Sequence, residues 1–408
     1  MTERLYYGNS FLYDFDAHVV EVIPASDAEP RAAVVLDRTA FYPTSGGQTF
    51  DTGWIASGQR QSRVVEVAEN DTGIIRHYLD DLLDLQPGMP VHGSIDEGRR
   101  RDHMQQHSGQ HVLSAAFVRL FDMPTVSFHM AEDYCSIDLD TKSLSREQLE
   151  AAERMANEII LEDRPVEIRF VSYQEAQDLE LRKLPPAERE HLRLISIHDF
   201  DLSACGGTHV QHTGQIGCIL LRKTEKVRQG IRVEFVCGQR AVKTARRDYT
   251  ALTEAATLFS SHIWEVPQQI RKLQEEGKAG RREREQMLEE IVEQHAARML
   301  SETPTTSGRK LVMQVFEDRD LAYIKLLSQK LTRLQPDVVA LLGTTEQLSV
   351  VTAASAGQSI NLGALLKQEL GNVGGRGGGG KDMAQGGVPN ESAVQSVLKA
   401  MAEHVRAS

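Results

Sequence analysis

The distribution of apolar and polar residues predicts a first stretch of short strands. Residues 5–95 contain apolar, β-branched runs, such as AAVVL at 32–36 and SRVVEVA at 62–68, separated by Gly, Pro, Asp and Asn. This pattern is typical of strands joined by tight turns. We therefore predict a small β-barrel over residues 1–95.

A mixed pattern follows in residues 96–242, which predicts an α+β domain. Helices are expected at 99–121 and 145–162, and Ser145 provides the second with a residue suited to the N-cap position. A strand is expected at 166–171. The stretch IGCILLRKTEKVRQGIRVEFVCG, residues 216–238, predicts strands joined by a basic turn.

The remaining residues change from a helical to an α/β pattern. Residues 243–303 are rich in Glu, Arg, Gln, Ala and Leu, which predicts a helical connector interrupted at Pro267 and weakened at Gly277 and Gly280. The segment TPTTSGR, residues 303–309, is expected to be a linker. Residues 304–408 then predict an α/β domain with a helix near 319–334.

The C-terminal domain contains the run GGRGGGGKDMAQGG at 374–387. Gly375 to Lys381 fit a phosphate-binding GxxxxGK loop, but Asp382 replaces the required Ser or Thr, and no buried strand is predicted before the run. We therefore expect a flexible loop, or a backbone surface that contacts RNA phosphates.

Composition places the 408-residue chain among globular proteins, with 40% hydrophobic and 25% charged residues. It shows neither a signal pattern nor an apolar run that could span a membrane, so a cytoplasmic protein is expected. Four cysteines are too few for a disulfide framework, and each is read as a core residue, a ligand or a nucleophile.

Net charge argues against general nucleic-acid binding, but the charge distribution is uneven. The formal net charge is -12, whereas residues 222–247 and 99–101 are strongly basic. Either cluster alone could be solvated surface, but together they flank a histidine motif. The predicted nucleic-acid contacts are Arg99, Arg100, Arg222, Lys223, Lys226, Arg228 and Arg232.

Two short motifs have the spacing of metal ligands. The sequence HMQQHSGQH places three histidines, His103, His107 and His111, four residues apart, on one face of a helix. CGGTH supplies Cys205 and His209. Two imidazoles from the first motif with the thiolate and imidazole of the second form a donor set suited to zinc. Spacing alone leaves open whether His103 or His111 is the partner of His107.

The segments HSGQHVLSAAF, CGGTHVQHTGQIG and DRTAFYPTSGGQTFDTG resemble the editing domain of alanyl-tRNA synthetase and its free-standing relatives, the AlaX trans-editing proteins. The glycine-rich tail resembles the DHH-associated domain of that synthetase, so nearly the whole chain is similar to the long AlaX form. No region resembles the ATP-dependent aminoacylation core. The resemblance implies one zinc ion per chain, bound by His107, His111, Cys205 and His209.

The resemblance further implies hydrolysis of the ester in mischarged tRNA(Ala), carrying serine or possibly glycine. His103 is then left to support a ligand or to face the substrate. In FYPTSGGQ, the Thr44 hydroxyl could bond a substrate hydroxyl, and the glycine amides could approach the ester. The predicted catalytic group is Thr44, Gly46, Gly47, Gln48 and His103. Asp199 and Asp201 are weak candidates for a general base, and we expect them instead to be solvated turn residues.

Four protein ligands would close a tetrahedral zinc. Expanded coordination, a loose ligand, or a zinc that only positions substrate therefore stay open. The alternative functions are a non-catalytic tRNA-binding or assembly module with structural zinc, and a deacylase for another tRNA, such as a threonyl type. A zincin peptidase is disfavoured because HExxH is absent. A homodimer through the helical or C-terminal region is expected.

Overall fold

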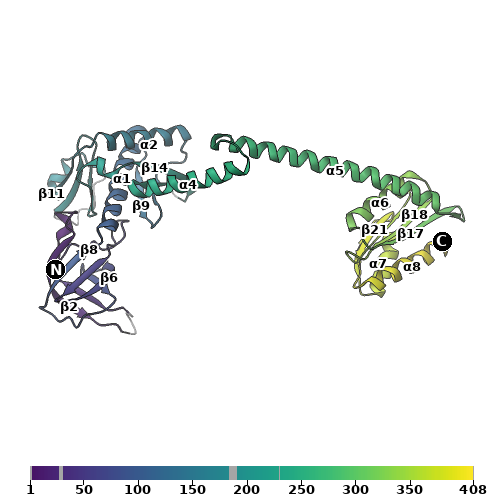
Figure 1. The fold of residues 1–408 in the computed structure, drawn as a ribbon, viewed down its shortest axis with the longest axis horizontal. Helices are drawn as coiled ribbons and strands as arrows, with labels where there is room; N and C mark the ends of the chain where they lie inside the picture. Colours follow the sequence, from purple (N-terminus) through teal and green to yellow (C-terminus); the bar gives the residue numbers. More distant parts are fainter. Residues whose placement is uncertain (1, 27–30, 183–190, 229, 408) are drawn as a thin grey trace. The chain divides into compact units, whose positions relative to one another are not determined.

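The computed structural model describes residues 2–26, 31–182, 191–228 and 230–407. The chain divides into two compact units, Met1–Glu254 and Ala255–Ser408 (Figure 1). The finer division into 1–95, 96–242, 243–303 and 304–408 remains a prediction. Among the described residues, no helix is long and apolar enough to cross a membrane.

The first unit begins with a closed barrel, which confirms the predicted architecture. Around the barrel the strands run in the order β2 (Asp14–Ile23), β3 (Ala33–Leu36), β7 (Ile75–Leu79), β6 (Arg60–Glu69), β5 (Gly53–Ser57) and β8 (Pro90–Ile95). Along β2, the buried residues Phe15, Ala17 and Val19 alternate with exposed ones, as a strand with one face in a core requires. Short strands β1 (Glu3–Arg4) and β4 (Arg38–Thr39) pair in parallel.

Helix α1 (Glu97–Phe121) is the centre of the next part of the unit. The Asp96 side chain accepts a hydrogen bond from the Arg99 amide and caps the helix. Helix α2 (Arg146–Leu161) packs on α1. Ser145 is its N-cap, as predicted, and also forms a capping box with Gln148. Both predicted helices are confirmed.

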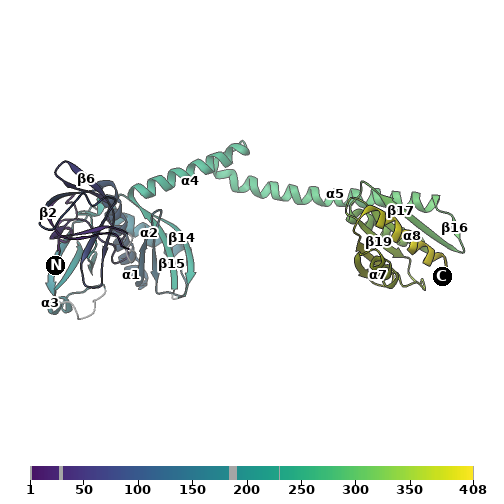
Figure 2. The same ribbon diagram turned by 90° about the horizontal axis from the view of Figure 1, so that it is seen from below.

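Two sheets complete the first unit. The four-stranded sheet has the order β14 (Ile219–Val227), β15 (Gly230–Cys237), β10 (Cys135–Leu139) and β9 (Thr125–Met130), and Figure 2 shows β14 and β15 beside α1 and α2. The three-stranded sheet consists of β11 (Val166–Ser172), β12 (His191–Ile197) and β13 (Asp201–Ala204). Helices α3 (Tyr173–Gln177) and α4 (Gly238–Leu258) follow β11 and β15.

A buried ion pair joins the barrel to α1. The Arg100 side chain is fully buried, pairs with Asp51, and donates hydrogen bonds to the backbone carbonyls of Ser10 and Ala40. Since this guanidinium is enclosed by protein, it offers no charge to a nucleic acid. The prediction of Arg100 as a nucleic-acid contact is therefore wrong.

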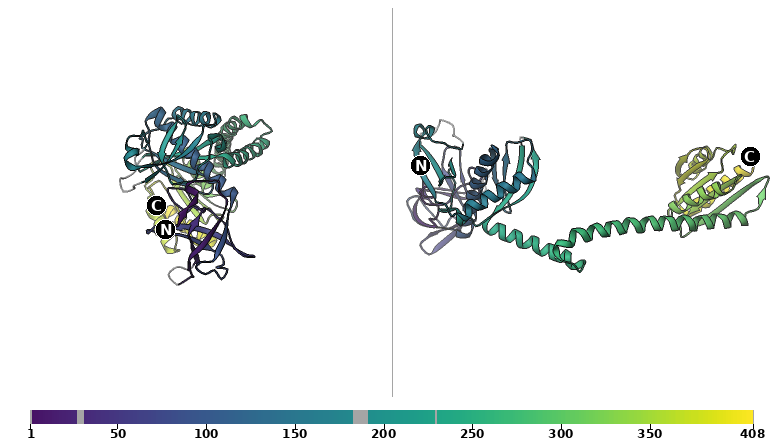
Figure 3. Two further views of the ribbon diagram at one scale, coloured as in Figure 1. Left: turned by 90° about the vertical axis from the view of Figure 1, so that its left-hand side faces the viewer. Right: turned by 90° about the horizontal axis from the view of Figure 1, so that it is seen from above.

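The second unit is a three-layer α/β arrangement (Figure 3). Its sheet has the order β16 (Thr305–Thr306), β17 (Arg309–Phe316), β18 (Val338–Thr344), β19 (Ser349–Ala354), β21 (Met383–Gly387) and β20 (Arg376–Gly379). One face packs against α5 (Val266–Glu302) and α6 (Leu321–Leu334), and the other against α7 (Leu362–Asn372) and α8 (Glu391–Ala407). Along β18, Val339 and Leu341 face the second pair of helices, while Ala340 and Leu342 face the first.

Two loop predictions in this unit are wrong. The glycine-rich run forms the β20–β21 pair. At Gly377 and Gly386, a Cβ would collide with the Leu370 side chain of α7 and with backbone atoms of the paired strand. Close packing thus explains Gly377 and Gly386, and the flexible-loop interpretation fails. The expected linker contains β16, which pairs with β17.

The predicted interruption of the helical connector precedes Pro267. Helix α4 ends at Leu258, and Pro267 lies in the first turn of α5, where its missing N–H costs nothing. Gly277 and Gly280 do not break α5, which continues to Glu302.

Candidate metal centre

Four side chains from two segments that are far apart in the sequence lie close together in the structure. Helix α1 supplies His107 and His111, and the loop after β13 supplies Cys205 and His209. One ligand atom from each lies within 4.8 Å of the others, and the three imidazoles are buried. This cluster could hold a metal ion. The choice that spacing left open falls on His111, because His103 lies outside the cluster.

Two distances within the cluster match the edge of a tetrahedral zinc site. The Cys205 Sγ lies 3.4 Å from His107 Nε2 and 3.3 Å from His209 Nε2. Zinc bonds of about 2.3 Å to sulfur and about 2.0 Å to nitrogen give a tetrahedral edge of about 3.5 Å. The residues therefore fit zinc both in donor chemistry and in separation.

The opposite nitrogen of each histidine is held by a hydrogen bond. Gln48 Oε1 lies 2.7 Å from His107 Nδ1 and also accepts from the Thr208 amide, so the His107 Nδ1–H is the donor and Nε2 carries the lone pair. The Nδ1 atoms of the other two histidines contact hydroxyl oxygens, His111 with Ser203 at 2.9 Å and His209 with Ser108 at 3.1 Å. All three Nε2 atoms are thereby left for a metal.

Asp201 supports His111 from behind. It is buried, pairs with Arg182 at 3.0 Å, and accepts a hydrogen bond from the Ser203 hydroxyl at 3.0 Å. Burial by itself would raise the pKa of Asp201, but its interactions with His111 and Arg182 lower that pKa overall. The expectation of a solvated turn residue is wrong for Asp201, whereas Asp199 is exposed.

The glycine motif of the barrel delivers Gln48 to the cluster. Gly46 and Gly47 have φ values of 57° and 84°, and Ser45 and Gln48 exchange backbone hydrogen bonds of 3.0 and 3.1 Å across them. Positive φ at both central residues is the signature of a type I′ turn. Thr44 is exposed, and among the described residues its hydroxyl has no hydrogen-bond partner.

His103 faces the barrel junction. The residue is 1% exposed, its Nε2 lies 3.3 Å from the Thr49 hydroxyl, and its Nδ1 lies 4.0 Å from an Asp51 oxygen. Burial, reinforced by the charge of Arg99, lowers the pKa of His103 to about 3. This imidazole is therefore neutral near physiological pH.

The two glycines of CGGTH have different surroundings. The spacing of CGGTH would also allow glycines that let the backbone turn tightly, but neither glycine has a positive φ, so such a turn does not explain them. A Cβ on Gly207 would collide with the His107 ring and approach Gln48 Oε1, whereas a Cβ on Gly206 would meet the Tyr7 hydroxyl at 3.5 Å. Gly207 is required because the loop passes directly against a ligand.

The predicted basic surface carries less free charge than its composition suggests. Arg222 pairs with Asp248, Lys223 with Glu225 and Arg232 with Asp138, while Arg99 lies over the Phe50 ring. Lys226 and Arg228, near the β14–β15 turn, are exposed and form no ion pair with the residues that the structure describes.

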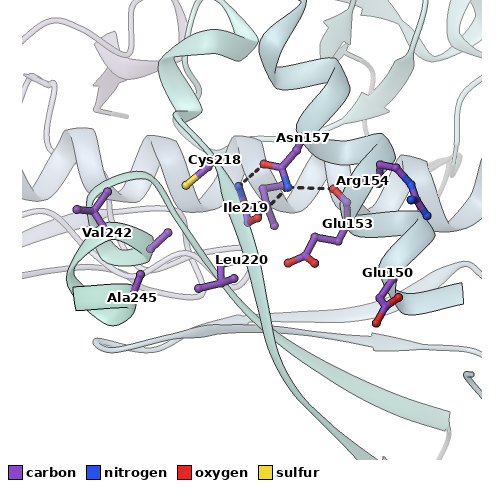
Figure 4. Close-up of a pocket in the computed structure, with 10 residues that line it drawn as sticks. Glu150, Glu153, Arg154, Asn157, Cys218, Ile219, Leu220, Val242 and Ala245 are labelled. Carbon is purple, nitrogen blue, oxygen red and sulfur yellow. Dashed lines mark hydrogen bonds between the residues drawn. The ribbon is translucent and has the colours of Figure 1, made fainter. Parts of the chain in front are cut away.

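A separate groove lies between α2, β14 and α4 (Figure 4). Asn157 lines this groove, and its side chain donates a hydrogen bond to the Ile219 carbonyl and accepts one from the Ile219 amide, both at 2.9 Å. None of the predicted site residues lines this groove. Its polar contacts join α2 to β14.

Family comparisons match three parts of the chain. Residues 12–99 match the family described as tRNA synthetases class II (A), and these residues form the barrel. Residues 192–233 match the threonyl and alanyl tRNA synthetase second additional domain, which includes Cys205 and His209. Residues 308–407 match the DHHA1 domain.

Individual relatives extend over the full chain. The alanyl-tRNA editing protein AlaX-L of Pyrococcus horikoshii is 30% identical over 420 residues, covering 100% of this chain and 99% of that protein. The alanine–tRNA ligase of Pyrococcus abyssi is 30% identical over 412 residues, covering 98% of this chain and 43% of the ligase. The chain thus spans less than half of the ligases it matches. The C-Ala domain of Aquifex aeolicus alanyl-tRNA synthetase is 21% identical, covering 24% of this chain and 96% of the domain, with a TM-score of 0.21.

Proposed function

The chain belongs to the AlaX-L family of alanyl-tRNA editing proteins, and on this premise we propose that it is a trans-editing hydrolase. It cleaves the ester between tRNA(Ala) and a wrongly attached amino acid, serine in the first place and glycine in the second. The observation that carries this proposal is the convergence of His107, His111, Cys205 and His209, each imidazole with its Nδ1 atom already hydrogen-bonded. Hydrolysis of an ester requires no ATP.

We propose one zinc ion per chain at this cluster. Zinc, when bound, supplies a Lewis acid that polarises an ester carbonyl or lowers the pKa of a water molecule. The chain's own contribution is to hold the ligands: Gln48 fixes the His107 ring, and Asp201 acts through Ser203 on the His111 ring. His103 remains a candidate for contact with substrate as a neutral imidazole.

We propose that Thr44 distinguishes seryl from alanyl esters. Its exposed hydroxyl is free to bond the serine hydroxyl, and the Gly46 and Gly47 amides donate no hydrogen bond to the described residues, so they are available to the ester. A site that pairs with a substrate hydroxyl rejects an analogue lacking it by up to about 10⁴-fold. Thr44→Val should therefore reduce the ratio of seryl to alanyl deacylation. An unchanged ratio would exclude this role.

Contacts to tRNA and to a second subunit complete the proposal. Lys226 and Arg228 are the preferred phosphate contacts, with Arg99, Arg222, Lys223 and Arg232 as further members. Helix α5 exposes apolar side chains that could pack in a homodimer: Ile270, Leu273, Met287, Leu288 and Ile291. Leu273→Glu should then shift the full-length protein to the monomer in sedimentation, whereas Gln274→Glu should not. The C-terminal domain is the alternative interface.

Deacylation of defined substrates tests the function. The zinc-loaded protein should release serine from Ser-tRNA(Ala), release glycine from Gly-tRNA(Ala) more slowly, and spare Ala-tRNA(Ala). Cys205→Ala should abolish release while tRNA affinity persists, and Cys218→Ala, outside the cluster, should retain activity. Tight tRNA binding without release would favour the non-catalytic module. Release from Ser-tRNA(Thr) alone would favour the threonyl type.

A further inference from the structure

Arg193 of β12 connects the loop that carries Cys205 to the beginning of the chain. Its side chain is buried, with 8% of the residue exposed. The Nη1 atom donates to the carbonyls of Cys205 at 2.7 Å and Gly207 at 3.0 Å, and Nε donates to the carbonyl of Tyr7 at 2.9 Å. One guanidinium thus bridges the metal loop and the short helical turn Leu5–Tyr7.

The partners of Arg193 differ from those of Arg100, which is fully buried, and of Arg240, whose side chain is 12% exposed. Arg100 pairs with Asp51 and Arg240 with Asp102, as buried charges normally do. No carboxylate of the described residues lies within 4 Å of the Arg193 guanidinium. Its bonded partners are three backbone carbonyls. A charge buried without a carboxylate is costly, which points to a role at the cluster beside it.

The loop needs such support because its sequence provides little. Gly206 and Gly207 have the largest backbone freedom of any residue type, and they separate the two ligands that the loop contributes. The Cys205 amide already donates to the Arg193 carbonyl at 3.0 Å, which continues the β12–β13 pairing to the first ligand. The Arg193 side chain extends this hold past both glycines.

We propose that Arg193 is a positioning residue for the metal centre. It fixes the carbonyls of Cys205 and Gly207, so that Cys205 and His209 face the ligands of α1, and it couples this loop to Leu5–Tyr7. This inference rests on the proposed metal site. It concerns the placement of the ligands and assigns Arg193 no contact with substrate.

Cobalt binding to the full-length protein tests the proposal. Arg193→Met removes the donors at similar length, Arg193→Lys keeps the charge but loses the planar fork, and Arg240→Met is the control for loss of a buried arginine. Cobalt affinity, measured against a chelator, should fall about 10- to 100-fold in Arg193→Met. The thiolate-to-cobalt absorption should weaken with it. Arg193→Lys should be intermediate, and Arg240→Met should keep the affinity and spectrum even if it unfolds more easily.

Hydrogen exchange tests the coupling to the N-terminal turn. Cobalt should slow amide exchange in residues 3–9 of the wild-type protein but not of Arg193→Met. Wild-type affinity, spectrum and protection in Arg193→Met would overturn the proposal. If Arg193→Met does not fold, Arg193→Lys decides: intermediate cobalt affinity would support the proposal, and full wild-type affinity would overturn it, because the planar fork would then not be needed. Absence of cobalt binding by the wild-type protein would instead overturn the metal site itself.

Discussion

The two segments that supply the ligands differ in what fixes them. In α1, a capped helix sets the spacing of His107 and His111 through its own backbone hydrogen bonds. The Cys205–His209 loop has no regular structure and depends on Gln48, Arg193 and a close contact with His107. The two helical ligands are thus positioned by local backbone hydrogen bonds, whereas the two loop ligands are positioned by tertiary contacts. Substitution of a residue that contacts the loop should therefore weaken metal binding, even where that residue lies far from the loop in sequence.

The largest effect is expected from Gly207→Ala. The added Cβ would collide with the His107 ring, which Gln48 and Phe128 hold in place. We expect metal affinity to fall about 100-fold, at the upper end for changes beside a ligand. Gly206→Ala is the matched control, since its Cβ would meet the Tyr7 hydroxyl at an ordinary 3.5 Å. Chelator competition measures both, and equal affinities for the two variants would contradict the difference we infer.

The same division explains what the sequence could predict. Local sequence patterns predict the barrel, helix α1 with three histidines on one face, and the Ser145 N-cap of α2. The structure contains all of these. His111 was assigned through family resemblance. In the structure, His103 lies outside the metal cluster, with its Nε2 atom 3.3 Å from the Thr49 hydroxyl.

Other features that the sequence analysis did not predict had a weaker sequence pattern or none. Asp201, Ser203 and Cys205 alternate with period two, so a strand there would place them on one face, and that pattern could have revealed the support for His111. Arg100 gave no such sign, because a buried and an exposed arginine look alike in a basic run. The glycines of β20–β21 suggest a loop in the sequence. Only the structure shows that α7 packs against Gly377 and Gly386.

A smaller effect, on the helical side, is expected from Asp201→Asn. The variant weakens the acceptor that orients Ser203 and His111 and leaves Arg182 without its carboxylate partner. Metal affinity should fall about 10-fold, because the helix backbone still holds His111 in place. Asp199→Asn changes an exposed carboxylate two residues away and should have no effect. A loss as large as that of Gly207→Ala would show that the helical ligands also depend on distant support.

The last effect is one on stability and not on metal affinity, and it concerns His103, the histidine of α1 that lies outside the metal cluster. The folded-state pKa of His103 is about 3, below the value of about 6.5 expected in the unfolded chain. Below about pH 6.5 the unfolded chain binds a proton that the folded protein does not, so stability falls on acidification.

For His103 this loss amounts to about 1.4 kcal/mol per pH unit, and it is absent above the unfolded pKa. Chemical denaturation of the metal-free protein between about pH 6.5 and 4.5 measures it by comparison with His103→Gln, which should show the shallower decline. All other histidines are the same in the two proteins, so the difference isolates His103. Parallel curves would mean that this position is open to protons in the folded protein. The part of α1 around His103 would then be more accessible to solvent than the part that carries His107 and His111. The stretch of α1 that is closed to solvent would begin only at His107.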